Sequence, residues 1–387
     1  MIKLVKSTFF NEADTKQKLA DFILKSEILS MGAEVKKFEE QFAKQQERKY
    51  AVMVNSGSSA NLILLQSLIN LERLKKGDRV GISAVTWSTN VMPVIQMGLI
   101  PVAIDCELET LNVSPKTLAP HVQNLRALFL TNVLGFCDDI AGIEKLCKEN
   151  DVLLFEDNCE SLGSKAYGRL LGNFGLAATF SFFVSHHLCT IEGGMVATDD
   201  EELYQQLLMT RAHGWDRNLP KEKQDELRKK HGISDFFAKF TFYDLSYNVR
   251  PTEIQGLLGT LQLPYLDETI KKRQENFKTI QAAVASNSEL IPLKTDHMEV
   301  VSCFANPVVA KTEEIFKKYL KRFEENQVEV RPVIVGNITH QPFYKKYVSN
   351  KENCPNADII HGQGFYFSNS PELTDEEVKI LMSLLVK

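Results

Sequence analysis

The residues best suited to chemistry lie at two predicted strand ends, one acidic and one carrying two histidines. The apolar run at 152–155 stops at Glu156 and Asp157, so a carboxylate follows the carboxyl end of a strand. A second apolar run ends just before His186 and His187, 29 positions after Asp157. Ligands of open α/β sheets bind at the carboxyl ends of strands, and imidazole transfers protons near neutral pH. We therefore expect the acid and the histidines to share one site.

A turn of small residues at 55–61 follows the predicted strand at 50–54 and precedes a helical pattern. A strand, a turn and a helix start in this order aim backbone N–H groups and hydroxyls at an anion. An ordinary helix-capping turn has the same local pattern. Trp87 stands at the exit of the strand predicted at 79–84, where it either stacks on a flat ligand or packs into the core.

Predicted strands and helices alternate every 20 to 30 residues between positions 50 and 200, which indicates a mainly parallel α/β sheet. We expect an N-terminal arm and helix at 1–48, a large domain at 49–262 and a smaller α/β domain at 263–387. The polar stretch at 217–231 is predicted to be a solvated loop or lid. Pro251 is expected to open the following helix.

Composition excludes several classes of protein. The net charge of -5 argues against a nucleic-acid surface, and no run of about 18 apolar residues predicts a membrane span. The N-terminus lacks the apolar core of a signal peptide, so a cytoplasmic location is expected. The seven cysteines form no CxxC or CxC pair, which predicts buried thiols and no metal site.

Together, these features closely resemble the sugar aminotransferases of the DegT/DnrJ/StrS type, which use pyridoxal phosphate. The resemblance covers essentially the whole chain, in the family's order and spacing. It implies the type I aspartate-aminotransferase fold, with a seven-stranded, mainly parallel sheet and a smaller C-terminal domain. The motifs that carry it are the Gly-Ser-Ser turn at 57–59, Trp87, EDNCES at 156–161 and SHHLCTIEGG at 185–194.

The resemblance also implies roles for single residues. Asp157 would pair with the pyridinium nitrogen of the cofactor, Trp87 would stack on its ring, and Glu160 stands where the family usually has a Gln near the ring hydroxyl. Asn248 matches an asparagine that reaches the phosphate from the neighbouring subunit, which implies a homodimer with shared sites. The positions matching the phosphate-binding set are Gly57, Ser58, Ser59 and Ser181.

One departure from the family pattern is informative. The aminotransferases carry a lysine at the position of His186, and this lysine binds the cofactor covalently and moves the proton. Lys165 lies in a predicted hairpin and Lys221 in the polar loop, so neither stands at a strand end to replace it. Histidine cannot form that stable covalent bond, but it remains a general base near neutral pH.

This substitution resembles the 3-dehydratase branch of the family, through RAHGW at 211–215, YNVRP at 247–251 and RPVIVGN at 331–337 as well. The branch implies C3 deoxygenation of a nucleotide-linked 4-keto-6-deoxyhexose, with GDP-4-keto-6-deoxy-D-mannose as the expected substrate. L-Glutamate would convert the cofactor to pyridoxamine phosphate, and His186 would then take the proton from its C4′ carbon. The product would enter a cell-surface polysaccharide such as an O-antigen or a capsule. The related branch that carries an iron–sulfur cluster is disfavoured, because the cysteines do not cluster.

Two alternatives stay open on the sequence. One is an ordinary nucleotide-sugar aminotransferase in which another base compensates, and the other is an inactive relative that serves as a binding subunit. Four further residues are weaker candidates for substrate contacts, since each has an ordinary structural explanation: His187, His213, Arg250 and Arg331.

Overall fold

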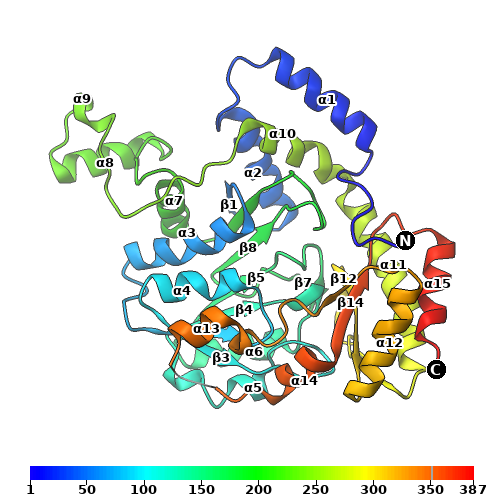
Figure 1. Cartoon of the computed structure of the whole chain (residues 1–387). Coiled ribbons are helices and arrows are strands. Elements are labelled where there is room, and N and C mark those ends of the chain that lie inside the picture. Colours follow the sequence, from blue (N-terminus) through cyan, green and yellow to red (C-terminus); the bar gives the residue numbers. More distant parts are fainter. Residues whose placement is uncertain (350–351) are drawn as a thin grey trace.

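The computed structural model describes residues 1–349 and 352–387, and a seven-stranded sheet forms its centre (Figure 1). Strand β9 is antiparallel to both of its neighbours, and the other strands run parallel to one another. The mainly parallel sheet expected from the sequence is confirmed. In spatial order the strands are β1 (Tyr50–Val54), β9 (Gly194–Thr198), β8 (Ala177–Ser181), β5 (Leu153–Asp157), β4 (Ala127–Thr131), β2 (Arg79–Ser83) and β3 (Ile100–Ile104).

Helices cover both faces of this sheet. Strand β4 is buried along its whole length, as expected of a parallel strand between two helical layers. Helix α3 packs on β8 and β9, and α2 packs on β1 and against α10. The helices of this part are α2 (Ala33–Gln45), α3 (Gly57–Asn70), α4 (Met92–Gln96), α5 (Pro115–Leu118), α6 (Ile140–Glu149), α7 (Glu201–Thr210) and α10 (Glu253–Gln262), and α1 (Glu12–Lys25) precedes them.

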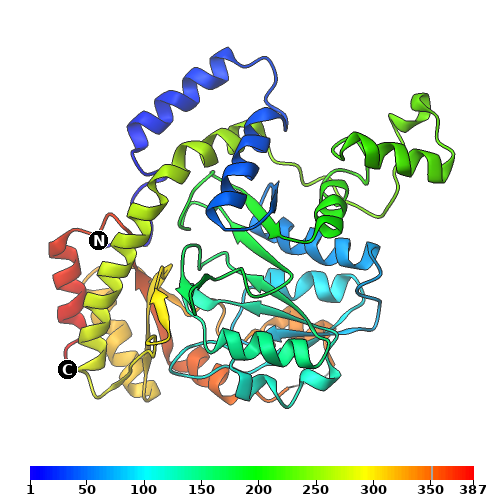
Figure 2. The same cartoon turned by 180° about the vertical axis from the view of Figure 1, so that it is seen from behind.

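The C-terminal part forms a second, antiparallel sheet in the order β10 (Leu290–Ile291), β12 (Ala305–Ala310), β14 (Gly364–Ser368) and β13 (Val330–Pro332). Helices α11 (Leu266–Ala285), α12 (Glu313–Glu325) and α15 (Asp375–Leu385) pack on it around their own apolar core (Figures 1 and 2). A small sheet of β11 (Met298–Val300), β6 (Lys165–Ala166) and β7 (Arg169–Leu170) links the two parts of the chain.

The expected domain division between residues 262 and 263 stays a prediction. The parts of the chain before and after this position make extensive contacts with each other. Helices α13 (Pro342–Tyr347) and α14 (Pro355–Gln363) carry residues of the larger core. The Ile338 N–H donates to the Ala84 carbonyl at 2.9 Å. Part of the expected small domain therefore returns to the large sheet.

The prediction of a loop at 217–231 is wrong over most of its length. Residues Lys221–His231 form helix α8, which projects from the body of the molecule with the short helix α9 (Asp235–Ala238) (Figure 1). No residue of α8 is buried, so the sequence has no apolar stripe to reveal it. Polar helix formers, the Lys221–Asp225 ion pair of 2.6 Å and Gly232 in the left-handed region at its C-cap stabilise it instead.

Helix α10 begins two residues later than expected. Thr252 is its N-cap and forms a capping box with Gln255, so Pro251 lies before the cap rather than at the first helical position. Among the described residues, no helix is long and apolar enough to cross a membrane.

Candidate active site

A cavity of about 390 Å³ opens at the carboxyl ends of β5 and β8. Seven of the residues predicted from the sequence line it together: Gly57, Ser58, Trp87, Asp157, Glu160, Ser181 and His186. Phe304 and Tyr366 from the C-terminal part complete the wall. None of the described residues that line this cavity is a lysine or an arginine. Asp157 and His186 line one cavity, but His187, which was expected to share the site, does not line it.

Asp157 is held in place by three donors at the end of β5. Its Oδ2 accepts from the side-chain amides of Asn61 at 3.1 Å and Asn90 at 2.7 Å, and its Oδ1 accepts from the Cys159 N–H at 2.9 Å. The carboxylate is 5% exposed and lines the cavity. These three hydrogen bonds fix the orientation of the carboxylate, which faces the cavity.

The small-residue turn approaches the end of β8 closely. A Cβ placed on Gly57 would lie 2.6 Å from the Ser181 Cβ, so this position needs a glycine. Ser56 caps α3 by accepting from the Ser59 N–H at 3.1 Å. The N–H groups of Gly57 and Ser58 and the hydroxyls of Ser58 and Ser181 belong to residues that line the cavity, and they have no hydrogen-bond partner among the described residues. An anion site at a helix N-terminus requires such free donors.

Ser59 lies beside this wall rather than on it. Its hydroxyl donates to the Asn55 side-chain oxygen at 2.6 Å and accepts from Ser56 at 3.0 Å. Its assignment to the phosphate-binding set therefore stays a prediction without support from the contacts.

His186 lies in the loop after β8. Its Nδ1 is 3.3 Å from the Ser181 carbonyl oxygen, which can only accept, so the neutral ring carries its proton on Nδ1 and leaves Nε2 free. Burial lowers the pKa of His186 to about 4, against the opposing effects of the Ser181 carbonyl and Asp157. The rings of Phe304 and Phe183 meet the imidazole edge-on, with centroids 5.4 and 6.1 Å away. The structure thus presents an unprotonated imidazole at neutral pH.

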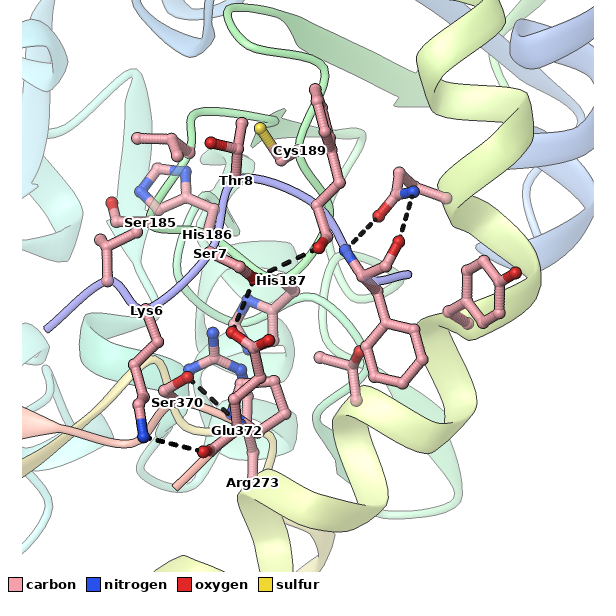
Figure 3. Close-up of a pocket in the computed structure, with 18 of the residues that line it drawn as sticks. Lys6, Ser7, Thr8, Ser185, His186, His187, Cys189, Arg273, Ser370 and Glu372 are labelled. Atoms are coloured by element: carbon pink, nitrogen blue, oxygen red, sulfur yellow. Dashed lines mark hydrogen bonds between the residues drawn. The ribbon is translucent and has the colours of Figure 1, made fainter. Parts of the chain in front are cut away.

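His187 faces a different environment. Its Nε2 donates to the Ser302 carbonyl at 2.7 Å, and burial lowers its pKa well below the usual value. In Figure 3 its ring lies next to Arg273, whereas the His186 ring lies apart from it, beside Ser185. His187 does not line the main cavity but a smaller one of about 60 Å³, so its assignment as a substrate contact stays a prediction.

Glu160 behaves as a neutral group in the cavity wall. Burial raises its pKa to about 8, and the Asp157 charge adds to this effect, although the Leu134 N–H, donating at 3.0 Å, opposes it. A protonated carboxyl has one O–H donor and one carbonyl acceptor, as an amide side chain has a donor and an acceptor. Glu160 can therefore replace the glutamine that the family usually places there.

Trp87 is 52% exposed at the cavity mouth. A large aromatic ring that remains exposed beside a polar cavity has one face available for a flat ligand. This position excludes the alternative that Trp87 is simply a packed core residue.

Four other predicted residues lie outside this cavity. Asn248 is exposed and accepts from Arg250 Nε at 3.1 Å, and His213 stacks on Trp215 at 4.8 Å. Arg331, on β13, forms an ion pair with Glu329 and lies opposite Tyr366, which lines the cavity, in the neighbouring strand. Within one chain, the structure does not bring them to the cavity.

Sequence reasoning missed several residues of the site. Asn61 and Asn90 had a local signal in the sequence. Asn61 follows Gly57, and Asn90 follows Trp87, each by about one helical turn. Phe304 and Tyr366 had none, because both belong to the C-terminal part, more than 100 residues from His186; Phe304 precedes β12 and Tyr366 lies on β14. The remaining wall residues are Ser56, Thr89, Thr131, Asn132, Cys159, Phe183, Ser185, Glu192 and Ile334.

The chain matches the DegT/DnrJ/EryC1/StrS aminotransferase family over residues 11–386. The protein belongs to this family. It is 37% identical over 372 residues to the GDP-4-keto-6-deoxy-D-mannose 3-dehydratase of Escherichia coli O55:H7, and the alignment covers 94% of this chain and 95% of that relative.

Two solved structures of family members resemble the whole chain. One is a GDP-4-keto-6-deoxymannose-3-dehydratase with a trapped PLP-glutamate geminal diamine, at 35% identity, a TM-score of 0.92 and complete coverage of both chains. The other is a His-to-Asn variant of such a dehydratase with bound GDP-perosamine, at 34% identity, a TM-score of 0.91 and complete coverage of both chains. The fold implied by the sequence is therefore confirmed.

Proposed function

We propose that this family member is a pyridoxal-phosphate-dependent 3-dehydratase of a nucleotide-linked 4-keto-6-deoxyhexose, with GDP-4-keto-6-deoxy-D-mannose as its substrate. L-Glutamate converts the cofactor to pyridoxamine phosphate before each turnover. The observation that carries the proposal is that His186 occupies the cavity beside Asp157, while none of the described lining residues is a lysine.

The residues present fit the cofactor. The α3 N-terminus, with Gly57, Ser58 and Ser181, forms a cradle that a Cβ at position 57 would fill, and it suits a phosphate. Asp157, fixed by Asn61 and Asn90, suits a protonated ring nitrogen. When bound, pyridoxal phosphate supplies a ring that accepts electrons from an adjacent carbon.

His186 supplies the base and sets the outcome of the reaction. Its neutral ring would take up a proton on Nε2 and would then give that proton to the C3 hydroxyl of the sugar, which would leave as water. Unlike a lysine amine, the imidazole forms no stable covalent bond to the cofactor. Amine transfer to the sugar therefore stays incomplete, and elimination of water predominates.

The nucleotide diphosphate requires positive charge that the described cavity wall lacks. Arg250 and Asn248 lie together on an exposed segment of the chain, outside the cavity. We propose a homodimer in which these two residues of one subunit reach the cavity of the other. Two dehydratases that are 37% and 35% identical to this chain are named for a GDP sugar, and a similar structure holds GDP-perosamine, which supports GDP as the nucleotide; a 3-dehydratase named for a dTDP sugar is 29% identical.

Mixing of inactive variants tests the shared site. His186→Asn and Arg250→Ala homodimers each have low dehydratase activity, but unfolding and refolding them together forms one complete site per mixed dimer. Recovery of about a quarter of the wild-type activity is expected, and recovery of none would contradict the shared site. Refolded wild-type protein is the control for losses in refolding.

The proposed function is tested by mass spectrometry of the reaction with pyridoxal phosphate, L-glutamate and a GDP-4-keto-6-deoxyhexose. Loss of one water from the ketone is expected, and this loss disappears in His186→Lys. Amine transfer by the native protein would identify an aminotransferase and refute the role given to His186. Cofactor binding with no reaction of any 4-keto sugar nucleotide would identify a binding subunit.

A further inference from the structure

A buried arginine lies behind the histidine loop (Figure 3). Arg273, on α11, is 4% exposed, and none of the described carboxylates lies within 4.0 Å of its guanidinium nitrogens. Its Nη1 donates to three backbone carbonyls, those of Phe304 at 2.6 Å, Asn369 at 3.1 Å and Cys303 at 3.4 Å. Burying a guanidinium without a carboxylate partner is costly, and a methionine of similar length would fill the space without that cost. The positive charge therefore needs an explanation beyond packing.

Two of the three carbonyls that Arg273 binds, those of Cys303 and Phe304, belong to the segment 302–304, which supports both histidines. Ser302 accepts from His187 Nε2 at 2.7 Å, and the Phe304 ring meets the His186 ring edge-on at 5.4 Å. The segment is also tied to the large domain, because the Phe304 N–H donates to the Leu134 carbonyl at 2.9 Å. A shift of this segment would move the wall against which His186 packs.

The Arg273 charge also acts on the histidines directly. It lowers the pKa of both His186 and His187, whereas Asp157 raises that of His186. Burial is the largest cause of both lowered pKa values, and the Arg273 charge adds to it. The other titratable groups that line a cavity together with His186 are Cys159, Glu160, Glu192 and Tyr366 in the main cavity and Lys6, Cys189, Tyr265 and Glu372 in the smaller one.

We propose that Arg273 is a positioning residue of the dehydration, which holds the segment 302–304 against His186. The inference rests on the function proposed above. It assigns Arg273 no contact with substrate or cofactor, because Arg273 does not line the main cavity.

The test compares Arg273→Met, which removes the charge and keeps the volume, with Arg273→Lys, which keeps the charge. Arg322→Met is the matched control, because Arg322 also donates to backbone carbonyls, those of Leu384 and Val386, within the C-terminal part. The first readout is the NMR titration of His186 in apo-protein labelled at histidine Cε1, with the signal assigned through His186→Asn. The second is the pH profile of kcat for water loss from the GDP-linked ketone.

We expect Arg273→Met to raise the His186 titration midpoint, to move the acid limb of kcat upward by the same amount and to lower kcat at neutral pH roughly 10-fold to 100-fold. The KM for the sugar nucleotide stays unchanged. Arg273→Lys restores the midpoint and only part of kcat, and Arg322→Met changes neither. A kcat in Arg273→Met equal to that of the wild type would overturn the inference.

Phe304→Leu provides a second route if Arg273→Met does not fold, because it keeps the Phe304 carbonyl and removes the ring beside His186. A lower kcat with an unmoved titration midpoint supports positioning through the segment 302–304, and an unchanged kcat overturns it. The NMR titration needs no substrate. A wild-type protein that removes no water from the ketone would refute the proposed function. An unchanged kcat of Arg273→Met, in a protein whose wild type does remove water, would refute only this inference.

Discussion

Replacing Gly57 by alanine tests whether the first turn of α3 holds the cofactor phosphate. The added Cβ would lie 2.6 Å from the Ser181 Cβ and 3.1 Å from the Cys159 sulfur, while ordinary Cβ contacts begin at 3.4 Å. Neither neighbour is the far end of a long flexible side chain. The turn and the end of β8 must therefore separate by about 0.8 Å to restore contact distance.

That displacement is enough to break hydrogen bonds to a phosphate. An N–H···O bond of about 2.9 Å becomes one of about 3.7 Å, beyond the useful range. Losing two bonds to a charged group, at about 1.5 kcal/mol each, weakens binding by about 3 kcal/mol. Since 1.4 kcal/mol corresponds to a factor of ten, the Kd for pyridoxal phosphate is expected to rise about 100-fold.

The assay is a titration of apo-protein with pyridoxal phosphate, followed by quenching of tryptophan fluorescence. Gly362→Ala is the matched control, because a Cβ there meets nothing within 4 Å and Gly362 lies in helix α14, away from the cavity. Thermal unfolding of both apo-variants separates a binding defect from a folding defect. If Gly57→Ala bound the cofactor within threefold of the wild type while Gly362→Ala did too, the phosphate site would have to lie elsewhere.

Three further outcomes follow from the structure. The pKa of His186 is lowered to about 4, and protonation inactivates a base. The kcat for dehydration is therefore expected to stay level as the pH falls through 6.5 and to decline only near pH 4. An acid limb at pH 6.5 in the pH profile of kcat would contradict this. Folding lowers the pKa values of His186 and His187, so below pH 6.5 the unfolded chain binds more protons than the folded chain does. The free energy of unfolding, measured with urea, therefore decreases as the pH falls below 6.5. A flat dependence would show that these imidazoles are not neutral in the fold. The buried Glu156 accepts from the N–H groups of Gly172, Phe174 and Gly175, at 2.7, 2.7 and 2.9 Å. Glu156→Gln turns an amide N–H toward one of these donors and is expected to lower the free energy of unfolding by about 2–3 kcal/mol, whereas the exposed Glu324→Gln changes it by less than about 0.5 kcal/mol. Equal effects of the two substitutions would refute the reasoning.

The alternation of strands and helices determined the large sheet from the sequence. Apolar runs ending in polar residues identified β5 and β8; Asp157 ends β5, whereas His186 lies in the loop after β8, which ends at Ser181. The turn before α3 was equally visible, because strand, small residues and helix are local features. The missing lysine is also a fact of the sequence alone, and it directs the function toward elimination.

Tertiary structure decided how these residues are supported. Asn61 and Asn90 lie 96 and 67 positions from Asp157, and the segment 302–304 that backs His186 is more than 100 residues from it. Such contacts arise from packing between distant elements and leave no periodicity in the sequence. Helix α8 was missed in the sequence because it has no buried face and therefore no apolar periodicity. The different surroundings of His186 and His187 were also not predictable, because His187 follows directly in the sequence yet points toward Arg273 in the packed chain. Local patterns specify which groups stand at strand ends, whereas only the packed chain specifies their partners, burial and protonation.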